Sequence, residues 1–194
     1  MEMPRRRTRN IAEKRARIIA AAQILFTRKG YSQTGIKEIA DHAEVATGLV
    51  IKHFESKLKL FEAALIEAFA HSPFSPAGKA GFGLRLADAI LNREAEVASP
   101  AMIILSIEDE EVRRVTMRVV REYGIKPTEH WLGPPMAAER AIYINLLGLT
   151  LSLLDRLFGA ELQADLAFPP VQMLINAIQQ AVDMTEQDGG AATE

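Results

Sequence analysis

Apolar residues recur with the spacing of an α-helix over most of the chain. Near the N-terminus, five of them fall at positions i, i+3, i+4, i+7 and i+8, on one helical face: Ile18, Ala21, Ala22, Leu25 and Phe26. Gly30 follows two basic residues, as is common where a helix ends. No alternating strand pattern longer than four residues occurs. The pattern therefore predicts an all-α protein.

Two short helices are expected next, at 36–42 and 47–53, joined by a tight turn. Ser56 then caps a longer helix. The two short helices are too small to bury a core alone, but with the preceding helix they form a three-helix unit. Small apolar groups suit its inward face: Ile36, Ile39, Ala40, Val45, Val50 and Phe54. Such a unit is typical of a helix-turn-helix, whose second helix enters the DNA major groove.

The remainder of the chain is also predicted to be helical. Residues 71–78 are rich in Pro, Ser and Gly and indicate a linker. Further helices are expected at about 82–97, 101–107, 108–125, 136–158 and 170–184. The helix at 136–158 is apolar nearly all round, so it must be buried on more than one side. Its longest uncharged run, 141–154, is shorter than the roughly 20 residues that span a bilayer.

Charge is distributed unevenly along the chain. The net charge is −2, yet residues 1–60 carry 13 Lys/Arg against 6 Asp/Glu, and residues 61–194 carry 10 against 19. This asymmetry indicates that the N-terminal end meets a polyanion; the alternative is a charged tail and chance.

Composition narrows the function further. The chain has no cysteine, and its four histidines lack the helical spacing of metal ligands, so neither a metal nor a cofactor is expected. It also lacks a phosphate-binding glycine loop and a nucleophile with a positioned base, so an enzyme is not expected. The basic N-terminus is not followed by an apolar signal-type stretch, which predicts a cytoplasmic protein without a membrane partner.

The stretch from Arg17 to Leu60 resembles the DNA-binding domain of the TetR family of bacterial transcriptional regulators. The resemblance covers about a quarter of the chain and rests on these elements: Ile18-x-x-Ala21-Ala22-x-x-Leu25-Phe26, Gly30-Tyr31, Thr34, Ile39-Ala40, Val45-x-x-Gly48 and His53-Phe54-x-Ser56-Lys57-x-x-Leu60.

The chain departs from the family pattern at two places. Glu44-Val45-Ala46 replaces the usual Gly-Val-Ser of the turn, and Ile51 replaces an aromatic residue, typically Tyr, that contacts a phosphate. Glu44 would repel phosphate unless its side chain points away or pairs with a basic residue. Whether Ile51 weakens DNA binding is left open by the sequence.

The resemblance implies roles for individual residues of the DNA-binding domain. Thr34 and Lys57 are expected to hold phosphates, although a solvated lysine is the alternative for Lys57. The groove-facing residues are expected to be Thr47, Gly48, Lys52 and His53, and the alternative for His53 is a structural histidine beside Phe54. Arg5, Arg6 and Arg7 are expected to enter a flanking minor groove, unless they only solubilise the chain.

The resemblance also implies a dimer and an effector site. The last two helices are expected to form the dimer interface through Leu147, Gly148, Leu151, Ser152, Leu154, Leu174, Ile175 and Ile178; the alternative is an ordinary monomer core. An apolar small molecule is expected to contact Phe82, Leu86, Met102, Leu105, Met117, Val120, Tyr123, Trp131, Asn145 and Leu149; the alternative is plain core packing.

These expectations combine into one organisation of about nine helices. It consists of a disordered basic arm (1–10), a helix-turn-helix domain (11–56), a connecting helix and linker (57–78), a helical effector-binding and dimerisation domain (79–186) and a disordered tail (187–194). The predicted function is a homodimeric repressor that binds operator DNA and is released by an unknown small molecule. The alternative is an effector-independent or architectural DNA-binding protein.

Overall fold

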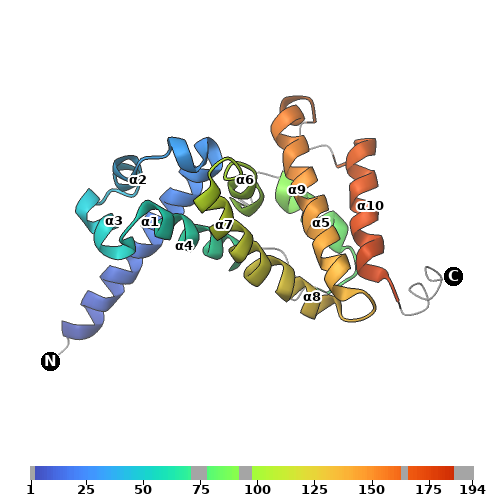
Figure 1. The fold of residues 1–194 in the computed structure, drawn as a ribbon, viewed down its shortest axis with the longest axis horizontal. Coiled ribbons are helices and arrows are strands. Elements are labelled where there is room, and N and C mark those ends of the chain that lie inside the picture. The colour runs from blue at the N-terminus through green and yellow to red at the C-terminus, as the bar shows by residue number, and fades with distance from the viewer. Residues whose placement is uncertain (1–2, 71–77, 92–97, 163–165, 186–194) are drawn as a thin grey trace. The chain divides into compact units, whose positions relative to one another are not determined.

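A computed structural model describes residues 3–70, 78–91, 98–162 and 166–185 of the chain (Figure 1). The described residues form ten α-helices and one π-helical segment, which confirms the all-α prediction. The chain divides into two compact units, residues 1–70 with 101–119 and residues 71–100 with 120–194. The sequence predicts one domain over 79–186, whereas the structure assigns 101–119 to the N-terminal unit.

The first unit contains the long helix α1 and five shorter helices. Their bounds are α1 Met3–Gln33, α2 Ile36–His42, α3 Thr47–Phe54, α4 Lys57–Ala70, the last part of α6 Ala98–Ile104, and α7 Glu110–Val119. Ser56 caps α4 as predicted, because its Oγ accepts a hydrogen bond from Lys59 N at 3.1 Å.

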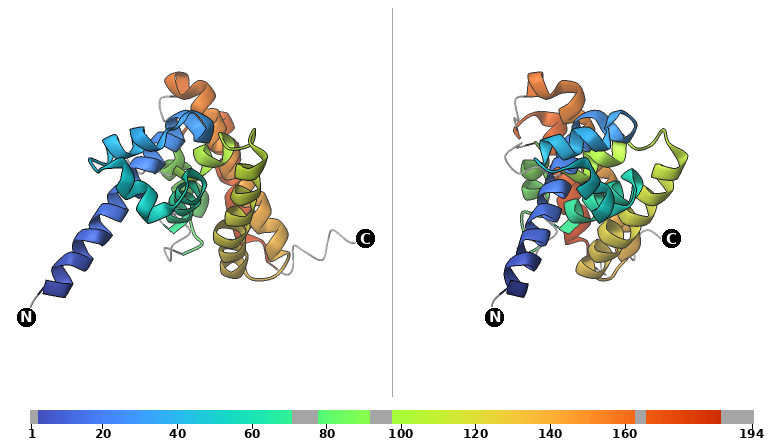
Figure 2. Two further views of the ribbon diagram at one scale, coloured as in Figure 1. Left: turned by 60° about the vertical axis from the view of Figure 1, so that its left-hand side comes forward. Right: turned by 90° about the vertical axis from the view of Figure 1, so that its left-hand side faces the viewer.

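Helix α1 begins earlier than the sequence predicts. Residues 3–10, expected to be part of a disordered arm, continue the helix, and these turns project away from α2, α3 and α4 (Figure 2). Arginine is a good helix former, and Pro4 lies in the first turn, where its missing N–H costs nothing. These residue types therefore favour continuing α1 toward the N-terminus.

The core of the first unit lies between α1 and α4. Phe26, Leu60, Phe61 and Leu65 are fully buried there. The ring of Phe26 meets that of Phe61 edge to face with centroids 5.2 Å apart, and Tyr31 lies 5.5 Å from Phe61. Aromatic pairs in this geometry add to the free energy gained from burial alone. The predicted apolar face of the first helix is therefore confirmed as core.

The end of α1 is held by side chains from its own turn and from α4. Gly30 interrupts the helix with φ 78° and ψ 174°. The Thr34 hydroxyl donates to Gly30 O at 2.7 Å. Lys57 Nζ donates to Tyr31 O at 3.0 Å and to Thr34 O at 3.2 Å, and lies 4.1 Å from the centre of the Tyr31 ring. These donors satisfy carbonyls that the end of a helix leaves without partners.

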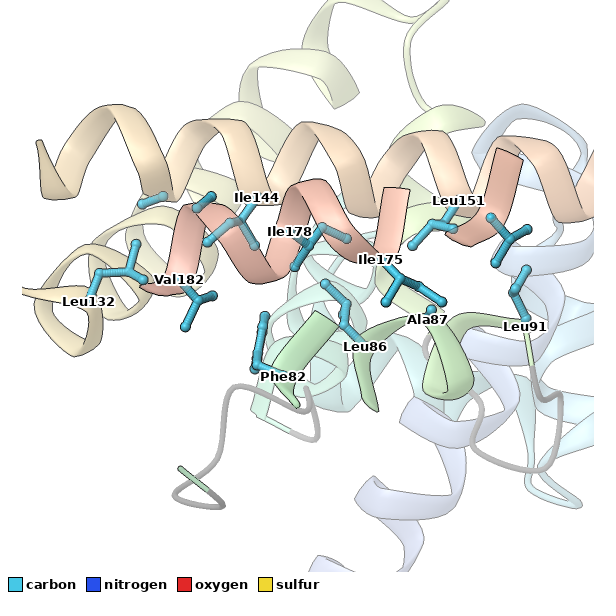
Figure 3. Packing of buried hydrophobic residues seen from close by; sticks show 13 residues of the cluster. Phe82, Leu86, Ala87, Leu91, Leu132, Ile144, Leu151, Ile175, Ile178 and Val182 are labelled. Carbon is cyan, nitrogen blue, oxygen red and sulfur yellow. The ribbon is translucent and has the colours of Figure 1, made fainter. Parts of the chain in front are cut away.

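The second unit is a helical cluster around α9. Its helices are α5 Phe82–Leu91, the π-helical η1 Val120–Ile125, α8 Lys126–Leu132, α9 Ala137–Leu162 and α10 Pro169–Asp183. Figure 3 shows side chains of α5, α8, α9 and α10 in one core, among them Phe82, Leu86, Leu132, Ile144, Leu151, Ile175, Ile178 and Val182. At Gly83, α5 comes so close to α10 that a Cβ atom would collide with Ile175 O.

Gly30→Ala is expected to lower the free energy of unfolding by about 2–3 kcal/mol, because the φ/ψ values at Gly30 are almost restricted to glycine. A Cβ there would also meet Leu105 O at 3.1 Å. Gly48→Ala is the control, since a Cβ at this helical position meets nothing within 4 Å; it should raise the unfolding free energy by roughly 0.5–1 kcal/mol. Urea denaturation measures both, and similar effects of the two substitutions would contradict this account.

Lys57→Ala is expected to cost about 1–2 kcal/mol of stability, because it removes a donor to Thr34 O and one of the two donors to Tyr31 O, which also accepts from Thr34 N at 3.2 Å. Lys59, two residues along, is the control: its Nζ is 2.5 Å from Glu55 Oε2, and both side chains are mostly exposed. Lys59→Ala should therefore change stability by less than about 0.5 kcal/mol. Thermal unfolding followed by circular dichroism compares them; an equal loss would show that Lys57 does not hold α1.

Candidate nucleic-acid interface

Helices α2 and α3 form the predicted helix-turn-helix. Their inward side chains are buried: Ile39 and Ala40 on α2, and Val50 and Phe54 on α3. In the turn, Val45 N donates to Ala40 O at 2.9 Å. The N-cap of α3 is Ala46, which supplies no side-chain hydrogen bond. The start of α3 therefore lacks the cap that Ser provides in the usual family turn.

Glu44 occupies the turn position where the family usually has glycine, and its backbone has a positive φ of 51°. Arg17 of α1 donates to the carbonyl oxygens of Ala43 and Glu44, and its Nη2 lies 3.3 Å from Glu44 Oε2. The glutamate thus pairs with a basic residue, which is one of the two arrangements the sequence leaves open. The side chain of Glu44 is 86% exposed, so the pair contributes little to stability.

The outward face of α3 is open to solvent. Thr47, Gly48, Ile51 and Lys52 are all exposed and fall at helical positions i, i+1, i+4 and i+5, so the structure brings them onto one face. His53 is half-buried, and its ring centre lies 6.2 Å from that of Phe54. This places His53 between its two predicted roles, since the ring both packs on the domain and reaches its surface.

The structure corrects the phosphate-binding role predicted for Thr34. Its side chain is 1% exposed, and its hydroxyl donates to Gly30 O. A buried hydroxyl that already has its acceptor inside the domain cannot also hold a DNA phosphate. Lys57 remains partly exposed, with two protein carbonyls as partners. The side chains of Arg5, Arg6 and Arg7 lie outside the described residues, so the minor-groove role stays a prediction.

Two titratable groups near this domain have shifted pKa values. The hydrogen bond from Lys29 lowers the pKa of Glu38, which keeps this carboxylate ionised and paired. Burial raises the pKa of Tyr31, and the negative charges of Asp109 and Glu111 raise it further. The Tyr31 hydroxyl therefore stays neutral at physiological pH.

The residues predicted to line an effector site divide between the two units. Met102, Leu105 and Met117 belong to the first unit, and the other seven to the second: Phe82, Leu86, Val120, Tyr123, Trp131, Asn145 and Leu149. Within the second unit, the rings of Phe82 and Trp131 lie 4.9 Å apart, while Tyr123 is largely exposed. Asn145 donates its amide to Ala141 O of its own helix at 2.8 Å. An effector site over all ten residues therefore remains a prediction.

Most residues of the predicted dimer interface already pack within the single chain. Leu151, Ile175 and Ile178 are buried in the core of the second unit itself, Gly148 and Ser152 are also buried, and Leu147, Leu154 and Leu174 pack against that core (Figure 3). The exposed apolar residues of α9 are instead Ile142, Tyr143, Leu146, Leu153, Leu157 and Phe158, and α10 exposes Met173. The exposed residues of α9 recur with the same helical spacing as the predicted stripe, but on a different face of the helix.

Helix α9 also has the length and apolar composition of a membrane span over Ala137–Gly159. The sequence predicts that its uncharged run is too short to span a bilayer, and the helix carries Glu139, Arg140, Asp155 and Arg156 within this range. Arg140 is 4% exposed and donates to Ala181 O at 3.1 Å on α10. A core helix of a helical domain has the same length and composition, and the contact of Arg140 with α10 is of the kind found in such a domain.

Comparison with known proteins agrees with this geometry. Residues 18–64, from the middle of α1 into α4, match the family described as bacterial regulatory proteins, tetR family. The chain is 42% identical over 53 residues to the transcriptional activator FasR of Mycolicibacterium smegmatis, and 38% identical over 61 residues to the transcriptional repressor BepR of Brucella suis. The match covers 27% and 31% of this chain, and 24% and 29% of those two relatives.

Solved structures extend the likeness to the whole fold. A TetR-family regulator from Rhodococcus sp. superposes with a TM-score of 0.69 at 18% identity, covering 89% of this chain and 100% of that one. GusR of Salmonella enterica superposes with a TM-score of 0.64 at 17% identity, covering 88% and 96%. At such identities the likeness establishes the fold alone. Residues 18–64 thus match the tetR family of bacterial regulatory proteins, and the chain has the fold seen in solved structures of TetR-family regulators.

Proposed function

We propose that the protein is a homodimeric, sequence-specific DNA-binding regulator that acts in the cytoplasm as a repressor and leaves its operator when a small molecule binds. The observation that carries the DNA-binding part is the exposed face of α3. It presents Thr47, Gly48 and Lys52 from a helix whose opposite side is buried. A helix held in this way enters the major groove without disturbing its own domain.

Each residue of this face supplies a different contact to DNA. Lys52 donates to guanine O6 and N7 or to a phosphate. Thr47 lies in the first turn, where its hydroxyl reaches base edges or the backbone. Gly48 lets the helix backbone approach closely, because no Cβ intervenes. The excess of basic residues over 1–60 draws this end of the chain toward the phosphates and makes binding dependent on salt.

The repressor part of the proposal rests on occupancy, since a dimer bound at an operator blocks polymerase. The names of the relatives include both an activator, FasR, and a repressor, BepR. The effector is proposed to be largely apolar and to bind among the apolar side chains of the C-terminal helices. The competing proposal, an architectural protein without an effector, predicts similar affinity for any duplex.

The second copy of this chain is the proposed partner for α9. Ile142, Leu146, Leu153 and Leu157 form an exposed stripe with the spacing of one helical face, and Met173 of α10 is 72% exposed. Burying such a stripe against its symmetry mate gains free energy from every leucine that leaves water. Dimerisation also doubles the number of base pairs read, which a single short helix needs for useful specificity.

The wild-type chain is expected to bind the duplex upstream of its own coding region more tightly than a scrambled duplex. Fluorescence anisotropy over a salt series measures this, with affinity falling as salt rises. Lys52→Ala should weaken binding by about 1–3 kcal/mol and reduce discrimination between the duplexes. Lys126→Ala is the control: Lys126 is an exposed lysine of the second unit that pairs with Glu122 at 2.8 Å. Equal affinity for both duplexes would favour the architectural alternative, and no binding to any duplex would refute the proposal.

Leu146→Asp is expected to convert the dimer to monomer, because a charge then lies in the middle of the α9 stripe. Leu146 is 55% exposed in the single chain, so the variant should remain folded. Leu84→Asp, at a leucine of α5 that is 49% exposed, is the matched control and should stay dimeric. Sedimentation equilibrium distinguishes the two; a Leu146→Asp protein that remained dimeric would show that this stripe is not the interface.

A further inference from the structure

Ile51 occupies the middle of the exposed face of α3 and is not part of the buried core of the domain. It is 49% exposed, whereas its neighbour Val50 is 1% exposed and Phe54 is 5% exposed. We propose that Ile51 is a specificity-determining residue that reads thymine in the operator by contacting its 5-methyl group. This inference rests on the proposed DNA-binding function.

The surroundings of Ile51 favour close contact with a base. Gly48 precedes it by three positions on the same face, and a Cβ at Gly48 would meet nothing within 4 Å. Because Gly48 has no side chain, the side chain of Ile51 protrudes beyond the preceding helical turn of α3. Lys52 is also exposed, and its flexible charged end can reach a phosphate or a base edge next to the contact. Ile51 is then the rigid apolar group of this face.

The chemistry of the groove leaves few partners for such a group. In the major groove, bases present hydrogen-bond donors and acceptors, and thymine alone adds a methyl group. An isoleucine placed against a donor or acceptor would remove water from it without replacing the hydrogen bond. Against a thymine methyl the same side chain buries apolar surface on both sides. The tyrosine that the family usually has at this position donates its hydroxyl to a phosphate, whereas isoleucine has no hydrogen-bond donor in its side chain.

Another methyl group on the face makes a control necessary. Thr47 precedes Ile51 by four positions, is exposed, and carries a methyl that can also contact thymine. Thr47→Ser removes that methyl and keeps the hydroxyl. Ile51→Ala removes the aliphatic group and leaves Cβ, and because the side chain is half exposed the domain should retain its fold. The two variants therefore separate the two methyl groups.

The test uses the full chain and an operator selected by it from a pool of random duplexes. Each thymine pair of the two half-sites is replaced by uracil in turn, which deletes the 5-methyl group and changes no hydrogen bond. At one symmetric pair, uracil should weaken wild-type binding about fourfold per half-site, the equivalent of about 0.8 kcal/mol for one buried methyl. Ile51→Ala should lose this difference between thymine and uracil, and Thr47→Ser should keep it.

The outcomes are distinct. Three results would overturn the role of Ile51 while leaving DNA binding intact. Replacement of thymine by uracil could leave the wild-type affinity unchanged at every position, or weaken the Ile51→Ala variant as much as the wild type. The third result is that only Thr47→Ser abolishes the difference between thymine and uracil. Failure to select any duplex would instead remove the proposed function, and the inference with it. Circular dichroism of both variants checks that the helices are retained.

Discussion

The length of α2 and α3 is the constraint on which the candidate interface depends. They have seven and eight residues, well below the length at which an isolated helix is stable in water. Packing must therefore stabilise these two helices, and the buried side chains of Ile39, Val50 and Phe54 provide it. Because the inward face carries the stability, the outward face of α3 is free to carry residues chosen for what they contact outside the protein.

The same constraint explains how the end of α1 is built. The turn into α2 must leave α1 sharply, and Gly30 permits this through a backbone conformation that other residues rarely adopt. Thr34 and Lys57 then bind the carbonyls that this turn exposes. Residues that the family resemblance assigns to phosphates are thus partly used to fix the position of the helices. For Lys57 both roles are chemically compatible, since an ammonium group has three donors and two of them go to protein carbonyls.

Much of the first unit could be predicted from the sequence because its signals are local. The apolar face of α1, the two short helices and the Ser56 cap each follow from spacing and residue type. Several side chains of the predicted dimer face are buried within the single chain, because α9 is apolar nearly all round and periodicity fixes the helix but not its rotation against α5 and α10. The grouping of residues 101–119 with the first unit could not be predicted, because no local signal tells a helix which distant helix it will meet.

The two departures from the family pattern differ in how the rest of the domain accommodates them. At Glu44, Arg17 binds the carboxylate and the neighbouring carbonyls, so the change is compensated inside the domain. Near Ile51, Val50 and Phe54 of the same helix are buried in the core, whereas the side chain of Ile51 is half exposed. A single exposed apolar side chain costs a folded protein little, so the fold does not select isoleucine here. On a face that is otherwise small, polar or basic, selection for isoleucine is best explained by what that face binds.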